Sequence, residues 1–336
     1  VSRDCMENIL TVKDLSISFK TEFGLVNPVQ GVSFDVKQNE TLGIVGESGC
    51  GKSITAYSVI RLLPNNAILG KNTQICFEGE NLLNRSKQDL AKIRGNRISM
   101  IFQEPMTSLN PIYTVGWQLA EAFTLHREMS EEEVKRESIE LLVKVRIPEP
   151  EKRLKEYPHQ LSGGMRQRVM IAMALACSPK LLIADEPTTA LDVTTQAQIL
   201  ELINGLKRDM DASIIMITHD LGVIAEMCDR VLVMYAGNIV ESAQVFELFD
   251  HPRHPYTRGL LSSIPNVEID KSSQKRLSTI KGFVPHPANF PKGCRFHPRC
   301  PHAFERCIQE NPLLLPIKGQ SDHFSRCWLE EGTDRT

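Results

Sequence analysis

The sequence predicts an α/β fold in which a parallel sheet is buried between helices. Two apolar runs, "KLLIAD" at 180–185 and "SIIMITHD" at 213–220, are not interrupted by the polar residues that a half-exposed strand would carry. Such runs are typical of strands that are buried on both faces of a parallel sheet. A helical stretch over residues 194–210 lies between them, and strands that alternate with helices define the α/β class.

The N-terminal third continues this alternation of strands and helices. "NILTVKDLSISF" at 8–19 alternates apolar and polar residues, which predicts a half-exposed strand. "VQGVSFDVKQNET" at 29–41 predicts a second strand that leads into a turn, and "TLGIVG" at 41–46 a short buried strand followed by glycine. "SITAYSVIRLL" at 53–63 has helical periodicity, and "RISMIFQ" at 97–103 is strand-like.

The middle of the chain is predicted to be helical and the end irregular. Residues 114–147 have a helical pattern, which includes a capping box with Ser130 at the N-cap and Glu133 three residues later. "GGMRQRVMIAMALACS" at 163–178 predicts a further helix. From about residue 250 the sequence is rich in Pro and His, has little periodicity and contains clustered Cys, so we expect a domain boundary there.

Length and composition exclude several classes of protein. The 336 residues suffice for one large domain and a smaller one, and 41% hydrophobic with 24% charged residues is ordinary for a soluble globular protein. A net charge of −2 argues against nucleic acid as a partner. No apolar run reaches the roughly 18 residues of a membrane-spanning helix, and no signal-peptide pattern opens the chain, which indicates a cytosolic protein. We expect Met6 to be the native start.

One glycine-rich segment predicts a nucleotide site. "GESGCGKS" at 46–53 matches G-x-x-x-x-G-K-[ST] and lies between a predicted strand and a predicted helix. Gly46, Gly49 and Gly51 allow the backbone to curl so that its N–H groups point at phosphate. Lys52 would reach the β- and γ-phosphates, and the Ser53 hydroxyl would bind Mg²⁺. The flanking strand and helix argue against a chance glycine-rich turn.

A pair of acidic residues follows one of the buried strands, in "IADEP" at 183–187. Asp185 lies at the carboxyl end of that strand, where open α/β sheets bind their ligands, and an acidic residue there can hold Mg²⁺. Glu186 is placed to orient or deprotonate an attacking water. By itself the pair could be a solvated acidic turn, but its presence with a phosphate loop favours catalysis.

With "LSGGM" at 161–165, the sequence resembles the ATPase subunits of ABC transporters. "GESGCGKS", "LLIADEP", the glutamine of "FQEP" and the histidine of "ITHD" have the order and spacing of that family over residues 9–245. The resemblance implies an enzyme that hydrolyses ATP to ADP and phosphate. It implies a RecA-like P-loop core with an antiparallel β subdomain and a helical signature subdomain at about 104–180, all within an ATPase domain over residues 1–250.

The resemblance also implies a role for each matching residue. ATP would be bound by Gly46, Ser48, Gly49, Cys50, Gly51, Lys52, Ser53, Ile54 and Gln103, and Mg²⁺ by Ser53, Gln103 and Asp185. Glu186 would be the general base, and His219 would contact the γ-phosphate. In this family two ATP molecules are buried in a head-to-tail dimer. Ser162, Gly163, Gly164 and Asp192 would contact the ATP of the partner subunit, Ser162 and Gly164 from a helix N-terminus that favours an anion.

Two further expectations concern the same nucleotide site. The family stacks adenine on an aromatic residue before the phosphate loop; Phe19 is the residue that we expect, and Phe23 is the alternative, although either could belong to the core. Cys50 takes a position that more often holds a small hydroxyl residue. Its thiol lies near Lys52 and a helix N-terminus, which favours thiolate. We therefore expect alkylation of Cys50 to inhibit hydrolysis and bound nucleotide to protect it.

The long form of the helical region and "HPRHPYTRGLL" at 251–261 resemble the ATPase subunits of dipeptide and oligopeptide importers, over nearly the whole chain. The resemblance implies a peripheral protein at the cytoplasmic face of the membrane, with two transmembrane permease subunits, a second identical or paralogous ATPase subunit and, indirectly, an extracytoplasmic peptide-binding protein. Importers of nickel and of some sugars share the pattern. A soluble ABC ATPase of DNA repair or translation is an alternative, but such proteins usually have two cassettes or a long coiled-coil insertion.

The last 86 residues, 251–336, contain four cysteines that predict a metal site: Cys294, Cys300, Cys307 and Cys327. Because thiols in the cytosol are kept reduced, we do not expect disulfides between these cysteines. Structural zinc sites usually pair ligands about two to four residues apart, and these gaps are wider. A [4Fe–4S] cluster accepts a broader spacing, and Cys300 precedes a proline as in the bacterial ferredoxin run. The family resemblance also points to a cluster. We expect [4Fe–4S], with Zn²⁺ and free thiols as alternatives.

Overall fold

A computed structural model describes residues 8–22, 24–104, 108–189, 191–263 and 279–331. Met6, the expected native start, lies outside the described residues. The chain forms two compact units, each assembled from separate segments. The first comprises Val1–Leu10, Val36–Thr41 and Cys76–Ile217, and the second comprises Thr11–Asp35, Leu42–Ile75 and Thr218–Thr336.

The first unit is organised around three parallel strands. They are β7 (Ile98–Ile101), β8 (Leu181–Asp185) and β9 (Ser213–Thr218), with β8 between the other two. Every residue of these strands is buried, so the strands expected from unbroken apolar runs are confirmed. Two shorter strands, β5 (Gln74–Phe77) and β6 (Glu80–Asn81), pair as an antiparallel hairpin.

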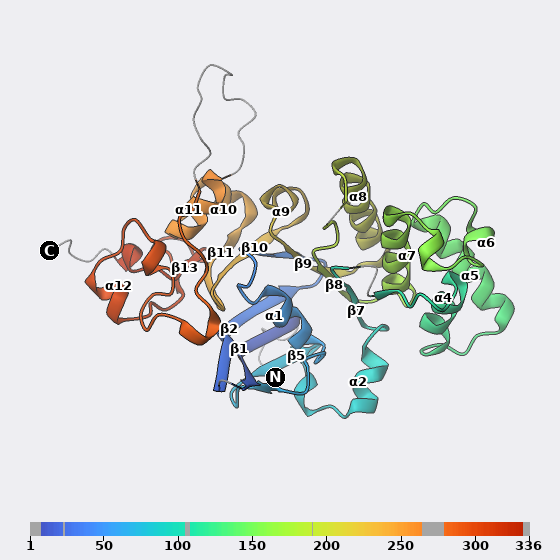
Figure 1. Ribbon diagram of the computed structural model, residues 1–336, viewed down its shortest axis with the longest axis horizontal. Helices are drawn as coiled ribbons and strands as arrows, with labels where there is room; N and C mark the ends of the chain where they lie inside the picture. The colour runs from blue at the N-terminus through green and yellow to red at the C-terminus, as the bar shows by residue number, and fades with distance from the viewer. Residues whose placement is uncertain (1–7, 23, 105–107, 190, 264–278, 332–336) are drawn as a thin grey trace, which may run out of the picture. The chain divides into compact units, whose positions relative to one another are not determined.

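Helices make up most of the rest of the first unit. They are α2 (Lys87–Ile93), α4 (Val115–Thr124), α5 (Glu131–Lys144), α6 (Pro150–Arg153), α7 (Gly163–Leu175) and α8 (Val193–Met210), with 3₁₀ turns at Leu82–Asn84 and Pro158–Gln160. The helices α4 to α7 pack together as a group, drawn in green in Figure 1. The capping box is confirmed, because the Ser130 N–H donates to the Glu133 carboxylate at 2.8 Å while the Ser130 hydroxyl accepts from the Glu133 N–H at 3.3 Å.

The second unit contains a sheet to which strands from distant parts of the chain contribute. The strand β3 (Thr41–Val45) runs parallel to β10 (Arg230–Tyr235), which pairs antiparallel with β11 (Asn238–Gln244). Two short strands near the end of the chain, β13 (Phe324–Ser325) and β12 (Leu315–Pro316), extend the sheet beyond β11. The cysteine-containing tail is therefore hydrogen-bonded to the sheet that precedes the phosphate loop.

A second group of strands in this unit consists of β1 (Asn8–Thr21), β2 (Gly24–Lys37) and β4 (Ala67–Leu69), with β1 neighbouring both of the others. The burial of β1 alternates along much of its length, which confirms the half-exposed strand expected from its pattern. The pairing of β1 with β4 is antiparallel, with Phe19 opposite Ala67.

The helices of the second unit are α1 (Lys52–Val59), α9 (Leu221–Met227), α10 (Val245–Asp250), α11 (Pro255–Ser262) and α12 (Glu305–Gln309), with 3₁₀ turns at Pro287–Asn289, His297–Arg299 and Trp328–Glu331. Much of residues 279–331 is irregular (Figure 1). Three aromatic rings anchor this segment, because Phe296 contacts Tyr235 and Tyr256 at centroid distances of 5.1 and 5.4 Å. Among the described residues, no helix is long and apolar enough to cross a membrane.

Candidate functional site

The phosphate loop joins β3 to α1 and requires glycine at two positions. Gly46 has φ 159°, and a Cβ atom there would lie 2.2 Å from the carbonyl oxygen of Met234. Gly51, the N-cap of α1, has φ 95° and would place a Cβ atom 3.0 Å from the Val29 side chain. Only glycine adopts these conformations at low cost. Gly46 and Gly51 therefore pack closely against Met234 and Val29, while Ser48 and Gly49 remain exposed.

Lys52 is buried within the curl of this loop. Its ammonium Nζ donates to the carbonyl oxygens of Gly46 and Glu47, at 2.8 and 3.1 Å. Ser53 and Ile54 follow in the first turn of α1 and are half-buried. A cation inside a backbone curl at a helix N-terminus is the arrangement that binds phosphate, as the motif predicts.

Glu47 connects the loop to the C-terminal part of the chain. Its N–H donates to the Tyr256 hydroxyl at 2.9 Å, and its carboxylate forms an ion pair with Arg299 at 3.0 Å. No sequence pattern predicted the contact between Glu47 and Arg299. The available signal was an arginine in "HPRC", directly before one of the four cysteines.

The expected thiolate at Cys50 is wrong. The Cys50 side chain is fully buried, and burial raises the pKa of its thiol more than the backbone hydrogen bond near Ala236 and the charge of Lys52 lower it. The loop after β10 packs against Cys50, since the Ala236 backbone lies near the thiol and the Gly237 N–H donates to the Cys50 carbonyl oxygen at 3.0 Å. The backbone of Cys50 remains part of the loop, as expected.

Two other expected residues of the nucleotide site lie in the second unit. Phe19 is half-buried near the end of β1, and its alternative, Phe23, lies outside the described residues. His219 is exposed directly after β9 and before Asp220, which caps α9. Whether Phe19 stacks on adenine stays a prediction.

In the first unit, the structure brings two predicted residues together. Asp185 is fully buried at the end of β8, and Glu186 follows with a left-handed φ of 47°. The Glu186 N–H donates to the Ile217 carbonyl oxygen at 2.9 Å, and its carboxylate accepts from Gln103 at 3.0 Å and from Thr189 at 2.9 Å. The carboxylate therefore has a defined orientation.

The signature segment and the start of α8 are neighbours in the same unit. Ser162 is the N-cap of α7, and its hydroxyl accepts from the Met165 N–H at 3.3 Å. Gly163 faces open space, whereas a Cβ atom on Gly164 would lie 3.1 Å from the Thr195 side chain. Asp192 caps α8, and the hydrogen bond from the Thr195 N–H holds the pKa of Asp192 below its usual value. Ala190, which precedes this segment, lies outside the described residues.

All four tail cysteines line one small cavity, together with Phe296 and Trp328. Burial raises the pKa of Cys294 to about 11 and of Cys327 to about 12, and the neighbouring thiols contribute to both shifts. Among the described residues, no group of three or more His, Cys, Asp or Glu side chains is arranged to hold a metal ion. The four thiols are thus gathered, but not in the tight geometry that a single ion requires.

The donor set of this cavity fits an iron–sulfur cluster in chemical type, because four thiolates are its usual ligands. The cavity volume of about 10 Å³ leaves room for about one water molecule. A cluster would therefore need the cysteine side chains to rotate away from the centre.

Comparisons with known proteins identify the class of the chain. Residues 29–189 match the family model described as ABC transporter, and residues 240–307 match the model described as oligopeptide/dipeptide transporter, C-terminal region. The dimeric ATP-binding cassette MJ0796, solved in a post-hydrolysis state bound to ADP and Pi, has a TM-score of 0.64 and 26% identity, over 70% of this chain and 98% of that one. CbiO1 from Clostridium perfringens, part of a CbiONQ complex, has a TM-score of 0.62 and 26% identity, over 73% and 92%.

Full-length relatives refine this class. The probable peptide ABC transporter ATP-binding protein y4tR of Sinorhizobium fredii is 53% identical, over 95% of this chain and 94% of its own length. The oligopeptide transport ATP-binding proteins AppD of Bacillus subtilis and OppD of Escherichia coli are 50% and 52% identical, over 98% and 91% of this chain and 100% and 89% of theirs. The chain belongs to the ATP-binding subunits of ABC transporters, in the oligopeptide/dipeptide family, and is an ABC ATPase.

Proposed function

We propose that this protein is the ATP-hydrolysing subunit that energises import of dipeptides or oligopeptides across the cytoplasmic membrane. The observation that carries the proposal is the presence in one chain of both family regions, the ATPase cassette and the peptide-transporter C-terminal region. The relatives at 50% identity or more are named as peptide transport ATP-binding proteins. The phosphate loop around Lys52 supports the ATP-binding part.

We assign the binding roles as follows. Backbone N–H groups of residues 48–53 and the ammonium of Lys52 hold the ATP phosphates, and Phe19 stacks on adenine. The Ser53 hydroxyl, Gln103 and Asp185 are the oxygen ligands proposed for Mg²⁺, the donor type that this ion prefers. When bound, Mg²⁺ neutralises the charge that develops on the phosphates.

The hydrolytic step is assigned to Glu186 and His219. Glu186 takes a proton from a water molecule, whose oxygen attacks the γ-phosphorus while the bond to the β–γ bridging oxygen breaks, releasing ADP and phosphate. The hydrogen bonds from Gln103 and Thr189 support this role, because they orient the carboxylate. His219 is exposed after β9 and would hold the transferring phosphate.

The assembly that we propose is a head-to-tail pair of ATPase subunits, identical or paralogous, on two transmembrane permease subunits. Ser162, Gly163, Gly164 and Asp192 would contact the ATP of the partner. The exposure of Ser162, Gly163 and Asp192 supports this, and Gly164 is half-buried. An extracytoplasmic peptide-binding protein would act indirectly, and nucleic acid is not a partner. The protein would be peripheral at the cytoplasmic face.

A patch of exposed apolar residues beside α4 supports the permease contact. Ile112 and Leu125 are 70% and 71% exposed, and the rings of Tyr113 and Trp117 stack at 3.8 Å. Single exposed apolar residues are ordinary, whereas apolar residues that together form a contiguous exposed patch mark interaction sites. We therefore assign this patch to the permease subunits, within the helical subdomain at about 104–180.

Peptide uptake by cells tests the substrate. A strain that lacks this chain would receive either the wild type or Glu186→Gln, and uptake of labelled tripeptide and of labelled nickel would be compared. Restored peptide uptake with the wild type alone supports the proposal. Restored nickel uptake without peptide uptake would contradict it, and so would peptide uptake that Glu186→Gln restores fully.

We further propose an ATPase domain over residues 1–250 and a C-terminal domain over residues 251–336. The C-terminal domain is small, irregular and Cys-rich. In it, a [4Fe–4S] cluster would be held by Cys294, Cys300, Cys307 and Cys327. Their common cavity supports this ligand set. Such a cluster would stabilise a segment with few core residues of its own. Anaerobic purification with iron, sulfide and zinc assays tests it: about four irons per chain agree with the cluster, whereas one zinc, or no metal, contradicts it.

A further inference from the structure

We propose that Arg299 is a positioning residue for the phosphate loop, and that through it the four-cysteine segment sets the affinity of the nucleotide site. The inference rests on the proposed function in one respect, namely that this loop binds ATP. It concerns a residue outside every motif that predicts ATP binding, 252 positions beyond its partner in the loop.

Glu47 is fixed on three sides, and each contact bears on the loop. Its N–H donates to the Tyr256 hydroxyl at 2.9 Å. Its carbonyl oxygen accepts from Lys52 at 3.1 Å. Its carboxylate pairs with Arg299 at 3.0 Å. Because the same residue holds both Arg299 and the Lys52 ammonium, a shift of Glu47 also moves an acceptor that positions Lys52.

Arg299 itself is rigidly held, with its side chain only 6% exposed. Its Nε donates to the Lys281 carbonyl oxygen at 3.0 Å, and its Nη2 donates to that of Ile280 at 3.4 Å. Its Nη1 also donates to the Tyr235 hydroxyl at 3.3 Å. A planar guanidinium can donate all of these hydrogen bonds at once, in fixed directions, whereas the ammonium of a lysine cannot. Arg299 is therefore a fixed support rather than a mobile surface charge.

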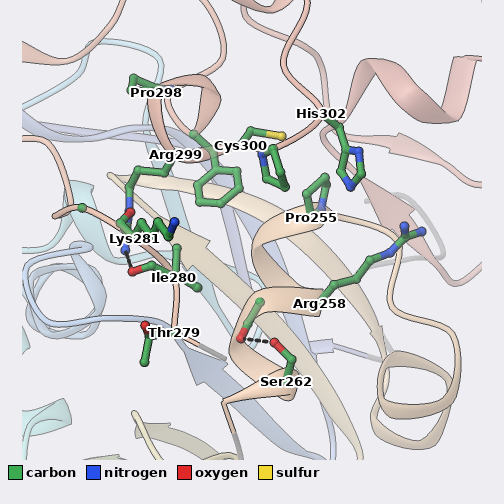
Figure 2. Close-up of a pocket in the computed structure, with 14 residues that line it drawn as sticks. Pro255, Arg258, Ser262, Thr279, Ile280, Lys281, Pro298, Arg299, Cys300 and His302 are labelled. Carbon is green, nitrogen blue, oxygen red and sulfur yellow. Dashed lines mark hydrogen bonds between the residues drawn. The ribbon is translucent and has the colours of Figure 1, made fainter. Parts of the chain in front are cut away.

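The backbone of Arg299 continues directly into that of Cys300, one of the four cysteines. Arg299 is directly followed by Cys300, and Figure 2 shows the two side by side on the wall of a cavity of about 840 Å³. Cys300 also lines the small cavity that it shares with the other three cysteines. A change in how Cys300 is bound would therefore change the backbone that carries Arg299.

A second arginine makes a parallel connection. Arg295 follows Cys294 and donates to the Ala236 carbonyl oxygen, in the turn between β10 and β11. The next residue in that turn, Gly237, donates to the Cys50 carbonyl oxygen of the phosphate loop at 3.0 Å. Two of the four cysteines thus adjoin arginines that reach the loop or the turn beneath it.

The physical consequence is a change in affinity and not in chemistry. Without its ion pair with Arg299, Glu47 loses one of the contacts that fix it, and its carbonyl oxygen, which accepts from the Lys52 ammonium, is held less firmly. ATP and ADP should therefore bind more weakly. The proposed base is held by other residues, because the carboxylate of Glu186 accepts from Gln103 and Thr189. The turnover number at saturating ATP should therefore change much less than the dissociation constant.

The experiment measures Kd for a fluorescent ATP analogue and for ADP, with kcat for hydrolysis, on the full chain. Arg299→Gln and Glu47→Gln should each weaken binding about tenfold, in the usual range of coupling between sites. The double variant should be no weaker than either single variant, because both remove the same contact. Arg306→Gln is the matched control: Arg306 precedes Cys307 but pairs with Glu310 and the Trp328 ring, and this variant should bind like the wild type.

Each result supports or overturns the inference. Wild-type affinity in Arg299→Gln, or additive losses in the double variant, would overturn it. If Arg299→Gln does not fold, Glu47→Gln alone decides, since unchanged affinity there also overturns it. Cys300→Ser should weaken ATP binding in the wild-type background but not in Arg299→Gln, and equal losses in both would overturn the link to the cysteines. Failure of the wild type to bind ATP would instead refute the proposed function.

Discussion

Gln103 and Glu186, 83 positions apart in the sequence, are joined by a hydrogen bond of 3.0 Å from the Gln103 amide nitrogen to the Glu186 carboxylate. Gln103 was expected to bind ATP and Mg²⁺, and Glu186 was expected to be the general base. The structure places the two side chains in contact. The amide therefore orients the proposed base in the arrangement seen here.

Glu186→Gln should bind ATP as tightly as the wild type but hydrolyse it at least about 100-fold more slowly, because the amide cannot accept the proton of water. The arrested protein should accumulate as a dimer with ATP. Phosphate release and size-exclusion chromatography with ATP measure the two effects. Wild-type turnover in this variant would contradict the assignment of the base, and Glu226→Gln, on an exposed position of α9, is the control.

Lys52→Ala should lose most nucleotide binding, because it removes the cation that lies inside the phosphate loop. The loss should be at least about 100-fold in Kd, as expected for a charge-assisted hydrogen bond to phosphate that has no substitute. Titration with a fluorescent ATP analogue measures it. Lys20→Ala, at an exposed position of β1, should bind normally, and an equal loss in both variants would show that the effect is not specific.

Cys50 should react slowly with iodoacetamide in the folded protein. Only the thiolate is nucleophilic, and burial both raises the pKa of this thiol and removes it from solvent. Modification at pH 8 should be at least about tenfold slower than for free cysteine, measured by peptide mass spectrometry over time. Unfolding in urea should restore an ordinary rate, whereas rapid labelling of Cys50 in the native protein would contradict the prediction.

Stability should decrease as the pH falls through the range from about 6.5 to 4. Burial lowers the pKa of His254 to about 4, and its Nδ1 accepts a hydrogen bond from the Tyr256 N–H, which requires the neutral ring there. In this range the unfolded chain binds a proton at His254 that the folded chain does not, so the free energy of unfolding falls, by up to about 1.4 kcal/mol per pH unit. Urea denaturation at several pH values measures the slope.

A His254→Gln variant should show a smaller slope over the same pH range, even if it is less stable at neutral pH. His159→Gln, at an exposed position, should retain the wild-type slope. An identical pH dependence in His254→Gln and the wild type would show that another group causes the effect.

The sequence predicts those features that depend on neighbouring residues. Unbroken apolar runs in the sequence predict the buried strands. Glycines at Gly46 and Gly51, the two positions where a side chain would clash, predict the phosphate loop. The buried state of Cys50 could not be predicted from local sequence. Lys52 is two positions away, but Ala236 and Tyr256, which lie near the thiol, are distant in the sequence.

Contacts between distant segments are likewise absent from any local pattern. The strand β13 has two residues and no periodicity, yet it pairs with β11. The ion pair of Glu47 with Arg299 depends on how that irregular segment packs against Tyr235 and Tyr256. The residues were visible in the sequence, but their pairing is a property of the folded chain.

The position of Arg299 has a consequence for how the protein is made. Chains are synthesised from the N-terminus, and their domains begin to fold as they emerge. A ribosome that has completed residue 250 has already produced every nucleotide motif, but not the arginine that fixes Glu47. An unfinished chain would then bind ATP weakly, so ATP-driven pairing of subunits would wait until the tail has emerged and packed.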